Sequence, residues 1–333
     1  MKSETNPKET KTNLKQIERK SLGMEENNFN EFMAQLKKAL YQKLGKEIRI
    51  DIHETVKNNG VTYRALAILR DGCNVSPNIR IDGFYRSYRE GVSLDEITAG
   101  ILEIYQYSRR EKIDLSFFTD FEKAKEHILF KVIGFEQNKE RLKEIPHFKF
   151  LDLALTFYLG VDLAEQEGSN ASVQIEREHL KLWDIDEGTL YDIAMQNTLQ
   201  KLPVRCQTIC DVILEMLEKD GIRPDQKSID EFKEKTDQMP MYVLSNPKNY
   251  FGAAVIYYPG ILKQLGESLK SDLIILPSSV HEIIILPANG KEDKEEMNAM
   301  ITDINIHQVA AEEVLSDHMY YYDLERDELR MPS

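Results

Sequence analysis

Two short apolar runs near the C-terminal end dominate the hydrophobic pattern of the chain. Leu273–Leu276 and Ile283–Leu286 are continuous apolar segments, separated by a short polar break and bounded by Ser and Pro. Runs of this kind are typical of strands buried on both faces, and the break is short enough for a hairpin. We therefore expect a buried β-hairpin here, with the C-terminal half of the chain packed around it.

The remaining C-terminal pattern predicts strands alternating with helices. Phe148–Leu159 has strand periodicity, which places Asp152 on the face opposite to Leu151 and Leu153. Met319–Asp323 is expected to be a strand that pairs with 328–330, with Tyr321 pointing opposite to its neighbours. Further expected elements are a returning strand over 171–175, a helix capped by Asp186 and ended by Pro203, a helix with Cys206 and Cys210 on its apolar stripe, a helix with a capping box at Ser228, a strand over 241–244, and helices over 259–269 and 292–307.

The N-terminal pattern also mixes helices and strands. Apolar residues at helical spacing predict a helix over 28–44, and alternation predicts a hairpin whose strands flank Asn58–Gly60. Expected next are a helix opened by a capping box at Ser93, a short helix opened by one at Thr119, a strand over 128–135 and a charged helix over 136–143. The fold class is therefore α+β with two mixed helix/sheet parts, assigned as 25–145 and 146–333 with the boundary at Pro146.

The first 24 residues contain hardly any apolar side chains. They cannot bury enough surface to offset the entropy of ordering, so 1–24 is expected to be a disordered tail. The alternative is a basic interaction arm, although its lysines are interleaved with glutamates.

Charge and composition narrow the classes of partner. The net charge is −14, which disfavours nucleic acids and anionic membrane surfaces as partners. No apolar run approaches the roughly 20 residues that span a bilayer, and the polar N-terminus has no signal region. Three cysteines in 333 residues do not suggest a secreted disulfide scaffold. These features predict a cytoplasmic protein with no membrane association.

Several stretches, in order along the chain, resemble an uncharacterised bacterial family. They are Asn58–Val61, Asn74–Ile79, Phe118–Phe121, Phe150–Ala154, His179–Trp183, Leu276–Glu282 and Leu315–Asp317. The family is domain of unknown function 5688, and the resemblance covers about 24–323. Since no activity, ligand or catalytic residue is established for that family, the resemblance carries almost no functional information over to this chain. No cofactor is expected from the sequence.

The candidate chemistry gathers near the predicted hairpin turn at 277–282. Ser278, Ser279, His281 and Glu282 lie at this turn, and Asp317 with His318 precede the last strand. If that strand borders the hairpin, His281 and His318 with the carboxylates form a divalent-metal site or an acid–base pair. The alternative is that the serines satisfy turn amides while His281 and Glu282 face solvent. Metalloprotease, serine-hydrolase and phosphate-loop motifs are lacking.

Two further features have a structural and a functional interpretation. Asp152 in an apolar strand needs a partner or a cleft, because an unpaired buried carboxylate costs several kcal/mol. It is therefore either paired with a Lys, Arg or backbone amide, or catalytic. Cys206 and Cys210, one helical turn apart, are either core residues or half of a metal site.

Two functions follow as hypotheses. The first is a non-catalytic accessory or interaction module with a protein partner. The second is a hydrolase, with or without a metal, that uses His281, Glu282, Asp317 and His318 near the 277–282 turn, and Asp152 as a further candidate.

Overall fold

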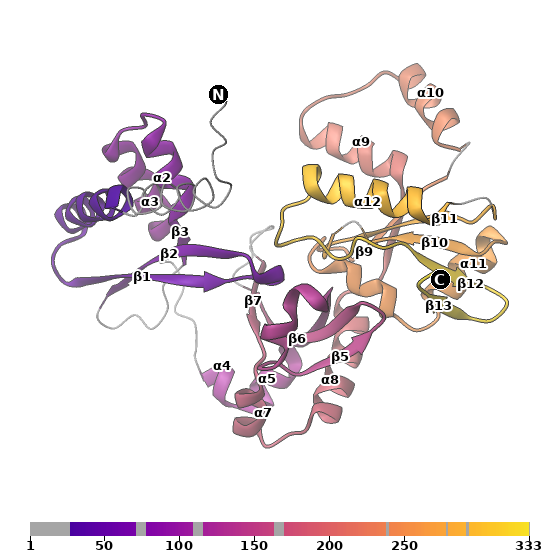
Figure 1. The fold of residues 1–333 in the computed structure, drawn as a ribbon, viewed down its shortest axis with the longest axis horizontal. Helices are drawn as coiled ribbons and strands as arrows, with labels where there is room; N and C mark the ends of the chain where they lie inside the picture. The colour runs from indigo at the N-terminus through magenta and orange to yellow at the C-terminus, as the bar shows by residue number, and fades with distance from the viewer. Residues whose placement is uncertain are drawn as a thin grey trace, which may run out of the picture. The chain divides into compact units, whose positions relative to one another are not determined.

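A computed structural model describes residues 27–70, 78–108, 116–162, 170–237, 240–277, 279–290 and 293–332. The predicted disordered tail over 1–24 lies outside these residues. Their contacts divide the chain into two units: Met1–Val56 with Thr62–Asp114, and Lys57–Val61 with Leu115–Ser333. The described residues form helices and three antiparallel sheets, so the predicted α+β class is confirmed (Figure 1).

The first unit is a small sheet covered on one face by helices. Its strands are β1 (Ile48–Val56), β2 (Thr62–Arg70) and β3 (Ile79–Arg80), in the order β1-β2-β3. A helix over 27–44, α2 (Ile81–Arg89) and α3 (Leu94–Ser108) lie on the same side of the hairpin (Figure 1). Their apolar side chains and those of alternate strand positions form one core. The predicted helix over 28–44, the hairpin and the capping box at Ser93 are confirmed.

The second unit contains a four-stranded sheet made of β4 (Ile128–Gly134), β5 (His147–Phe150), β6 (Leu153–Asp162) and β7 (Asn170–Gln174). Its order is β4-β6-β5, and β7 pairs with the far end of β6. β4 pairs with β6 along its whole length. This non-local pairing places β4 in the second unit, so the division falls at Asp114 and Pro146 lies inside the unit.

The predicted single strand over Phe148–Leu159 is wrong. Leu151 has φ 54°, and it forms with Asp152 a two-residue turn that folds β6 back on β5. The alternation of apolar residues continues across this turn, which is why the sequence pattern does not reveal it. Asp152 therefore lies in a turn and not within a strand.

A six-stranded sheet completes the second unit and contains the predicted hairpin. Its order is β13-β12-β10-β11-β9-β8. The hairpin strands β10 (Leu273–Leu276) and β11 (Ile283–Pro287) pair in register at the centre, which confirms the prediction. The flanking strands are β8 (Arg205–Thr208), β9 (Tyr242–Ser245), β12 (Tyr320–Asp323) and β13 (Glu328–Arg330). The predicted pairing of β12 with β13 is also confirmed.

The main core of this unit lies between its two sheets. Phe130 and Leu155 from the first sheet and Ile275 and Tyr320 from the second belong to one buried cluster. The opposite face of the six-stranded sheet is covered by α12, against which Tyr321 packs, so Tyr321 points away from its neighbours as predicted. The helical elements are α4 (Ser116–Thr119), α5 (Phe121–Ala124), η2 (Lys125–His127), η3 (Glu136–Asn138), α6 (Lys139–Leu142), α7 (Arg177–Trp183), α8 (Glu187–Lys201), α9 (Ile209–Lys219), α10 (Gln226–Asp237), η4 (Gly252–Tyr257), α11 (Ile261–Leu269) and α12 (Lys294–Gln308).

Aspartate side chains cap the N-termini of four of these helices, α5, α8, α10 and α12. Asp186 accepts a hydrogen bond from the amide of Thr189 and caps α8, as predicted. Asp120 caps α5 in place of Thr119, and Asp225 caps α10 in place of Ser228, by accepting amide hydrogen bonds. A carboxylate upstream of the first helical turn fulfils the same requirement as the predicted hydroxyls. Within the described chain, we find no helix with the length and apolar character of a membrane span.

Candidate functional site

The turn that follows β10 holds its own polar side chains in place. Ser279 is buried; its hydroxyl donates to Glu282 Oε1 (2.8 Å) and accepts from the amide of His281 (3.0 Å). A serine that satisfies a turn amide in this way is the structural interpretation of this turn. Ser278 lies outside the described residues.

His281 joins three segments of the second unit. Its ring stacks on Phe251 with 5.9 Å between ring centres and an interplanar angle of 8°. Its Nδ1 accepts from the amide of Phe251 (3.2 Å), and its Nε2 lies 3.5 Å from Glu313 Oε1. The side chain therefore ties the hairpin turn to the segment before η4 and to Glu313.

Asp152 is the centre of a second polar cluster. Its carboxylate accepts hydrogen bonds from the hydroxyls of Ser316 (2.6 Å) and Tyr320 (2.7 Å), and His318 Nδ1 lies 3.2 Å away. Ser316 and Tyr320 are buried, whereas His318 is half-exposed. Burial, followed by the nearby charge of Asp152, raises the pKa of Tyr320 well above its ordinary value. The phenol therefore remains a donor, and Asp152 has the partners that a buried carboxylate requires.

The predicted His/carboxylate residues have separate partners. His318 contacts Asp152, His281 contacts Glu313, and Glu282 accepts from Ser279. Asp317 accepts from the side chain of Asn305 (2.8 Å). No group of three or more His, Cys, Asp or Glu in the described residues is arranged to hold a metal ion. His281 and His318 thus contact different carboxylates, Glu313 and Asp152.

The geometry at Ser316 also differs from that of a nucleophilic serine. Such a serine donates to the imidazole, and the carboxylate orients the far side of that ring. Here the hydroxyl of Ser316 donates to Asp152 itself and accepts from the backbone amide of His318 (3.0 Å). The arrangement joins the β5–β6 turn to the segment before β12, and the acceptor of the Ser316 hydroxyl is a carboxylate and not an imidazole.

The predicted shared helix face of Cys206 and Cys210 is wrong. Cys206 lies in β8 opposite Leu244, and α9 begins at Ile209 after a capping box formed by Thr208 and Asp211. Cys206 is exposed and Cys210 is buried. The helical spacing of the apolar residues continues through the strand, so the pattern alone does not locate the start of the helix.

A polar row across the four-stranded sheet was not predicted from the sequence. Lys131 of β4 lies opposite Thr156 of β6, which lies opposite His147 of β5. The Lys131 ammonium lies over the ring of Phe251 (4.3 Å). Burial, together with the charge of Arg141, lowers the pKa of Lys131 to about 7. A lone lysine in the apolar run of β4 is the signal that could have revealed it.

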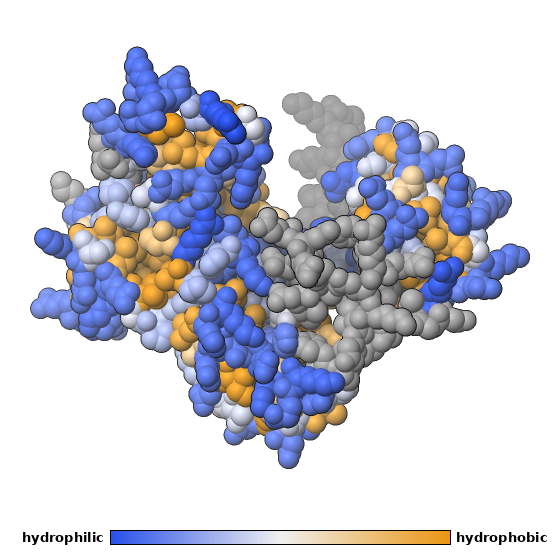
Figure 2. Space-filling view, turned by 180° about the vertical axis from the view of Figure 1, so that it is seen from behind, coloured by the Kyte–Doolittle hydropathy of each residue, from blue (hydrophilic) through white to orange (hydrophobic). Residues whose placement is uncertain are grey.

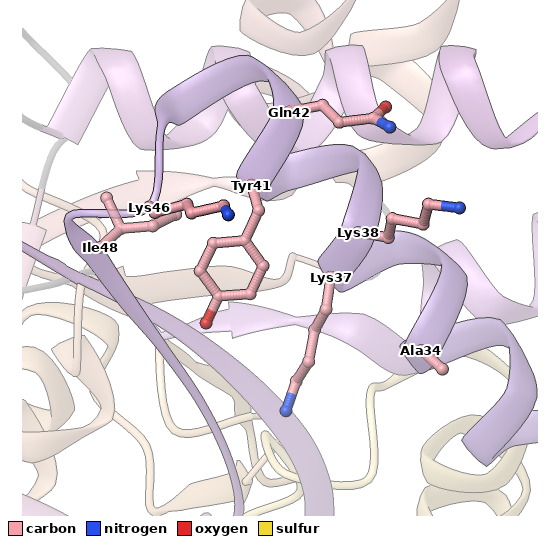
Figure 3. A pocket seen from close by; sticks show the side chains of 7 residues that line it. All are labelled: Ala34, Lys37, Lys38, Tyr41, Gln42, Lys46 and Ile48. Atoms are coloured by element: carbon pink, nitrogen blue, oxygen red, sulfur yellow. The ribbon is translucent and has the colours of Figure 1, made fainter.

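A groove in the first unit lies between the helix over 27–44 and the start of β1. It has a volume of about 720 Å³ and is lined by Ala34, Lys37, Lys38, Tyr41, Gln42, Lys46 and Ile48. Figure 3 shows the ring of Tyr41 between Lys37 on one side and Lys46 with Ile48 on the other. An aromatic and aliphatic surface flanked by two ammonium groups suits an acidic ligand that also has an apolar side chain.

Apolar side chains are exposed on the second unit as well. Met216 of α9 and Ile306 of α12 are 62% and 70% exposed. Figure 2 shows apolar residues, in orange, among hydrophilic ones at the upper left, on the side of the molecule where α9 and α10 lie. The adjoining helix α10 carries charges of both signs, such as Lys227 and Glu231. The apolar side chains of α9 therefore adjoin a helix with charges of both signs, whereas lysines line the groove.

Comparisons with known proteins identify the family. A family model described as "Family of unknown function (DUF5688)" matches residues 29–324. The chain belongs to this family. No curated protein and no solved structure matches the chain. The DUF5688 match includes the groove, the Asp152 cluster and Lys131, but it assigns no role to any of them.

Proposed function

We propose that this DUF5688 protein is a non-catalytic accessory protein of the cytoplasm, which binds an acidic segment of a protein partner in the groove of the first unit. The groove carries the proposal, because it offers an apolar floor formed by Tyr41 and Ile48 with lysines beside it (Figure 3). A hydrolase would need His281, Glu282, Asp317 and His318 in one site, whereas these side chains have separate partners.

Local charge supports an acidic partner. The segment 37–49 contains five basic residues and one acidic residue, although the whole chain has a net charge of −14. An acidic ligand is repelled by the chain on average and attracted at this groove, so the contrast favours one site. Arg49 is paired with Asp51 (2.6 Å). That hydrogen bond, and to a smaller extent the charge of Lys37, lowers the pKa of Asp51.

A peptide fits this groove better than a nucleic acid does. Single-stranded nucleic acids are held by successive aromatic rings along a positive groove, and duplexes by many phosphate contacts. Among the residues that line this groove, Tyr41 is the one aromatic side chain, beside Lys37, Lys38 and Lys46. A short acidic peptide with one apolar anchor matches that number of contacts.

The test uses a fluorescein-labelled peptide of four glutamates around a phenylalanine, measured by fluorescence anisotropy at low salt. The full chain should bind it, and the variant Lys37→Glu with Lys46→Glu should bind at least tenfold more weakly, because both flanking charges are reversed. The matched control is Lys233→Glu with Lys235→Glu, which reverses two exposed lysines of α10. The control should bind like the wild type.

Three results would contradict the proposal. One is no binding of the peptide by the wild-type chain. Another is an equal loss of affinity in both double variants, which would indicate a dependence on net charge alone. The third is displacement of the bound peptide by a single-stranded oligonucleotide at lower concentration than by unlabelled peptide.

A further inference from the structure

We propose that the outer face of the β4–β6–β5 sheet binds an oxyanion, a phosphate or carboxylate group, between Lys131, Arg141 and the hydroxyl of Thr156. This site lies in the second unit and is independent of the groove. Strand register, charge and an unpaired buried hydroxyl all point to this site.

Strand register places the site on one face of the sheet. Residues directly opposite in antiparallel strands point to the same side, so Lys131 and Thr156 share a face. Their neighbours Phe130 and Leu155 point to the other side, into the main core. Lys131 and Thr156 therefore lie on the face that is not filled by that core.

Two cations on this face have no counter-ion in contact. In the described residues, neither the ammonium of Lys131 nor the guanidinium of Arg141 makes a hydrogen bond or ion pair. Arg141 lies close enough to Lys131 that its charge, in addition to burial, lowers the pKa of Lys131. Burial also lowers the pKa of Arg141. Glu176 attracts Arg141 from a distance, but its carboxylate caps α7. A buried charge without a partner costs several kcal/mol, and two like charges increase the cost.

The hydroxyl of Thr156 is the second, independent observation. Thr156 is fully buried, and its Oγ1 has no hydrogen-bond partner in the described residues. A buried hydroxyl without a hydrogen-bond partner destabilises the fold. An oxyanion on this face would accept from the hydroxyl and neutralise the nearby ammonium group, so one ligand would relieve both costs.

Packing against aromatic rings does not remove the need for an anion. The Lys131 ammonium lies 4.3 Å from the ring centre of Phe251 and 5.7 Å from that of Tyr158. Cation–π contacts of this kind offset only part of the cost of burying the charge. The rings instead shield the ammonium from water, which strengthens its attraction for an anion.

The experiment measures the thermal unfolding midpoint of the full chain in phosphate, acetate and chloride at one ionic strength and pH 6.5. Phosphate or acetate should raise the midpoint of the wild type above its value in chloride, because a ligand stabilises the state that binds it. The two salts distinguish a phosphate site from a carboxylate site. The increment should disappear in Lys131→Met and decrease in Thr156→Val.

Two controls keep the test decisive. Lys149→Met removes an exposed lysine of β5 that lies over the ring of Phe135 (4.5 Å), and it should retain the full increment. If Lys131→Met does not fold, Arg141→Gln at a partly exposed position should weaken phosphate or acetate binding at least tenfold by calorimetric titration. Equal increments in the wild type and in Lys131→Met, or none in the wild type, would overturn the proposal.

Discussion

Asp152 and Lys131 are both charged side chains at the four-stranded sheet, but only one of them has partners. The carboxylate of Asp152 contacts two hydroxyls and an imidazole. The ammonium of Lys131 lies over a phenyl ring and contacts no anion within the described part of the chain. A charge whose hydrogen-bonding capacity is taken up by the protein holds elements together, whereas a charge without a partner has capacity left for a ligand.

The largest expected change in the free energy of unfolding follows from removing the carboxylate of Asp152, which has hydrogen-bond partners. Asp152→Ala should lower the free energy of unfolding by about 3 kcal/mol, because it leaves the buried hydroxyls of Ser316 and Tyr320 without an acceptor. Urea unfolding measures this change. The control Glu178→Ala, at an exposed position of α7, should change it by less than about 0.5 kcal/mol.

A double-mutant cycle sharpens this prediction. In a Tyr320→Phe background, Asp152→Ala should cost less, with a coupling energy of about 0.5–3 kcal/mol between the two positions. Strict additivity of the two changes would show that the hydrogen bond between them does not contribute to stability.

Removing the ammonium of Lys131, which contacts no anion, should change the free energy of unfolding in the opposite direction. Lys131→Met should raise the free energy of unfolding by about 1–3 kcal/mol at pH 6 in the absence of added phosphate or carboxylate, because it removes a buried cation. Folding lowers the pKa of Lys131 from 10.5 to about 7, so between these values the unfolded chain binds more protons. The contribution of Lys131 to the free energy of unfolding of the wild type therefore rises with pH over that interval.

The difference in the free energy of unfolding between Lys131→Met and the wild type should consequently be largest below pH 7, and it should decrease as the pH approaches 10.5. Urea unfolding at several pH values checks this, with Lys149→Met as the reference for changes shared by all variants. Arg141, His147, Lys149 and Tyr158 are charged or titratable groups that share this face with Lys131. A gap that does not change with pH would mean that Lys131 keeps its ordinary pKa.

The smallest expected effect distinguishes the partners of Asp152 from one another. His318 is half-exposed, and Asp152 keeps both hydroxyl donors without it. His318→Ala should therefore lower the free energy of unfolding by less than about 1 kcal/mol. A loss as large as that of Asp152→Ala would show that the imidazole, and not the hydroxyls, stabilises the carboxylate.

The elements that the sequence predicts correctly are those set by local patterns. The continuous apolar runs of β10 and β11 and the alternation at Tyr321 determine burial directly, so the hairpin and the final strand are foreseen. The β5–β6 turn is not, because it depends on a positive φ at Leu151 without a Gly, Pro or Asn to mark it. Placing β4 in the second unit requires knowledge of its distant partner β6.

The same distinction applies to the site. The position of Asp152 among apolar residues indicates that its carboxylate needs a partner. The hydroxyls that donate to this carboxylate belong to Ser316 and Tyr320, which are distant in the sequence. Lys131 is a single polar residue in an apolar strand, and its significance depends on which side chains lie across the sheet. Such contacts are properties of the tertiary fold, and local spacing does not encode them.

The turn over Lys57–Val61 has a practical consequence for cutting the chain into fragments. Its residues belong to the second unit, although the strands on either side belong to the first. Asn59 exchanges hydrogen bonds with the buried side chain of Asn138 and donates to the carbonyls of Ala311 and Val314. A recombinant fragment that starts at Leu115 would thus lose a native component, and adding a peptide that spans 57–61 should partly restore its stability.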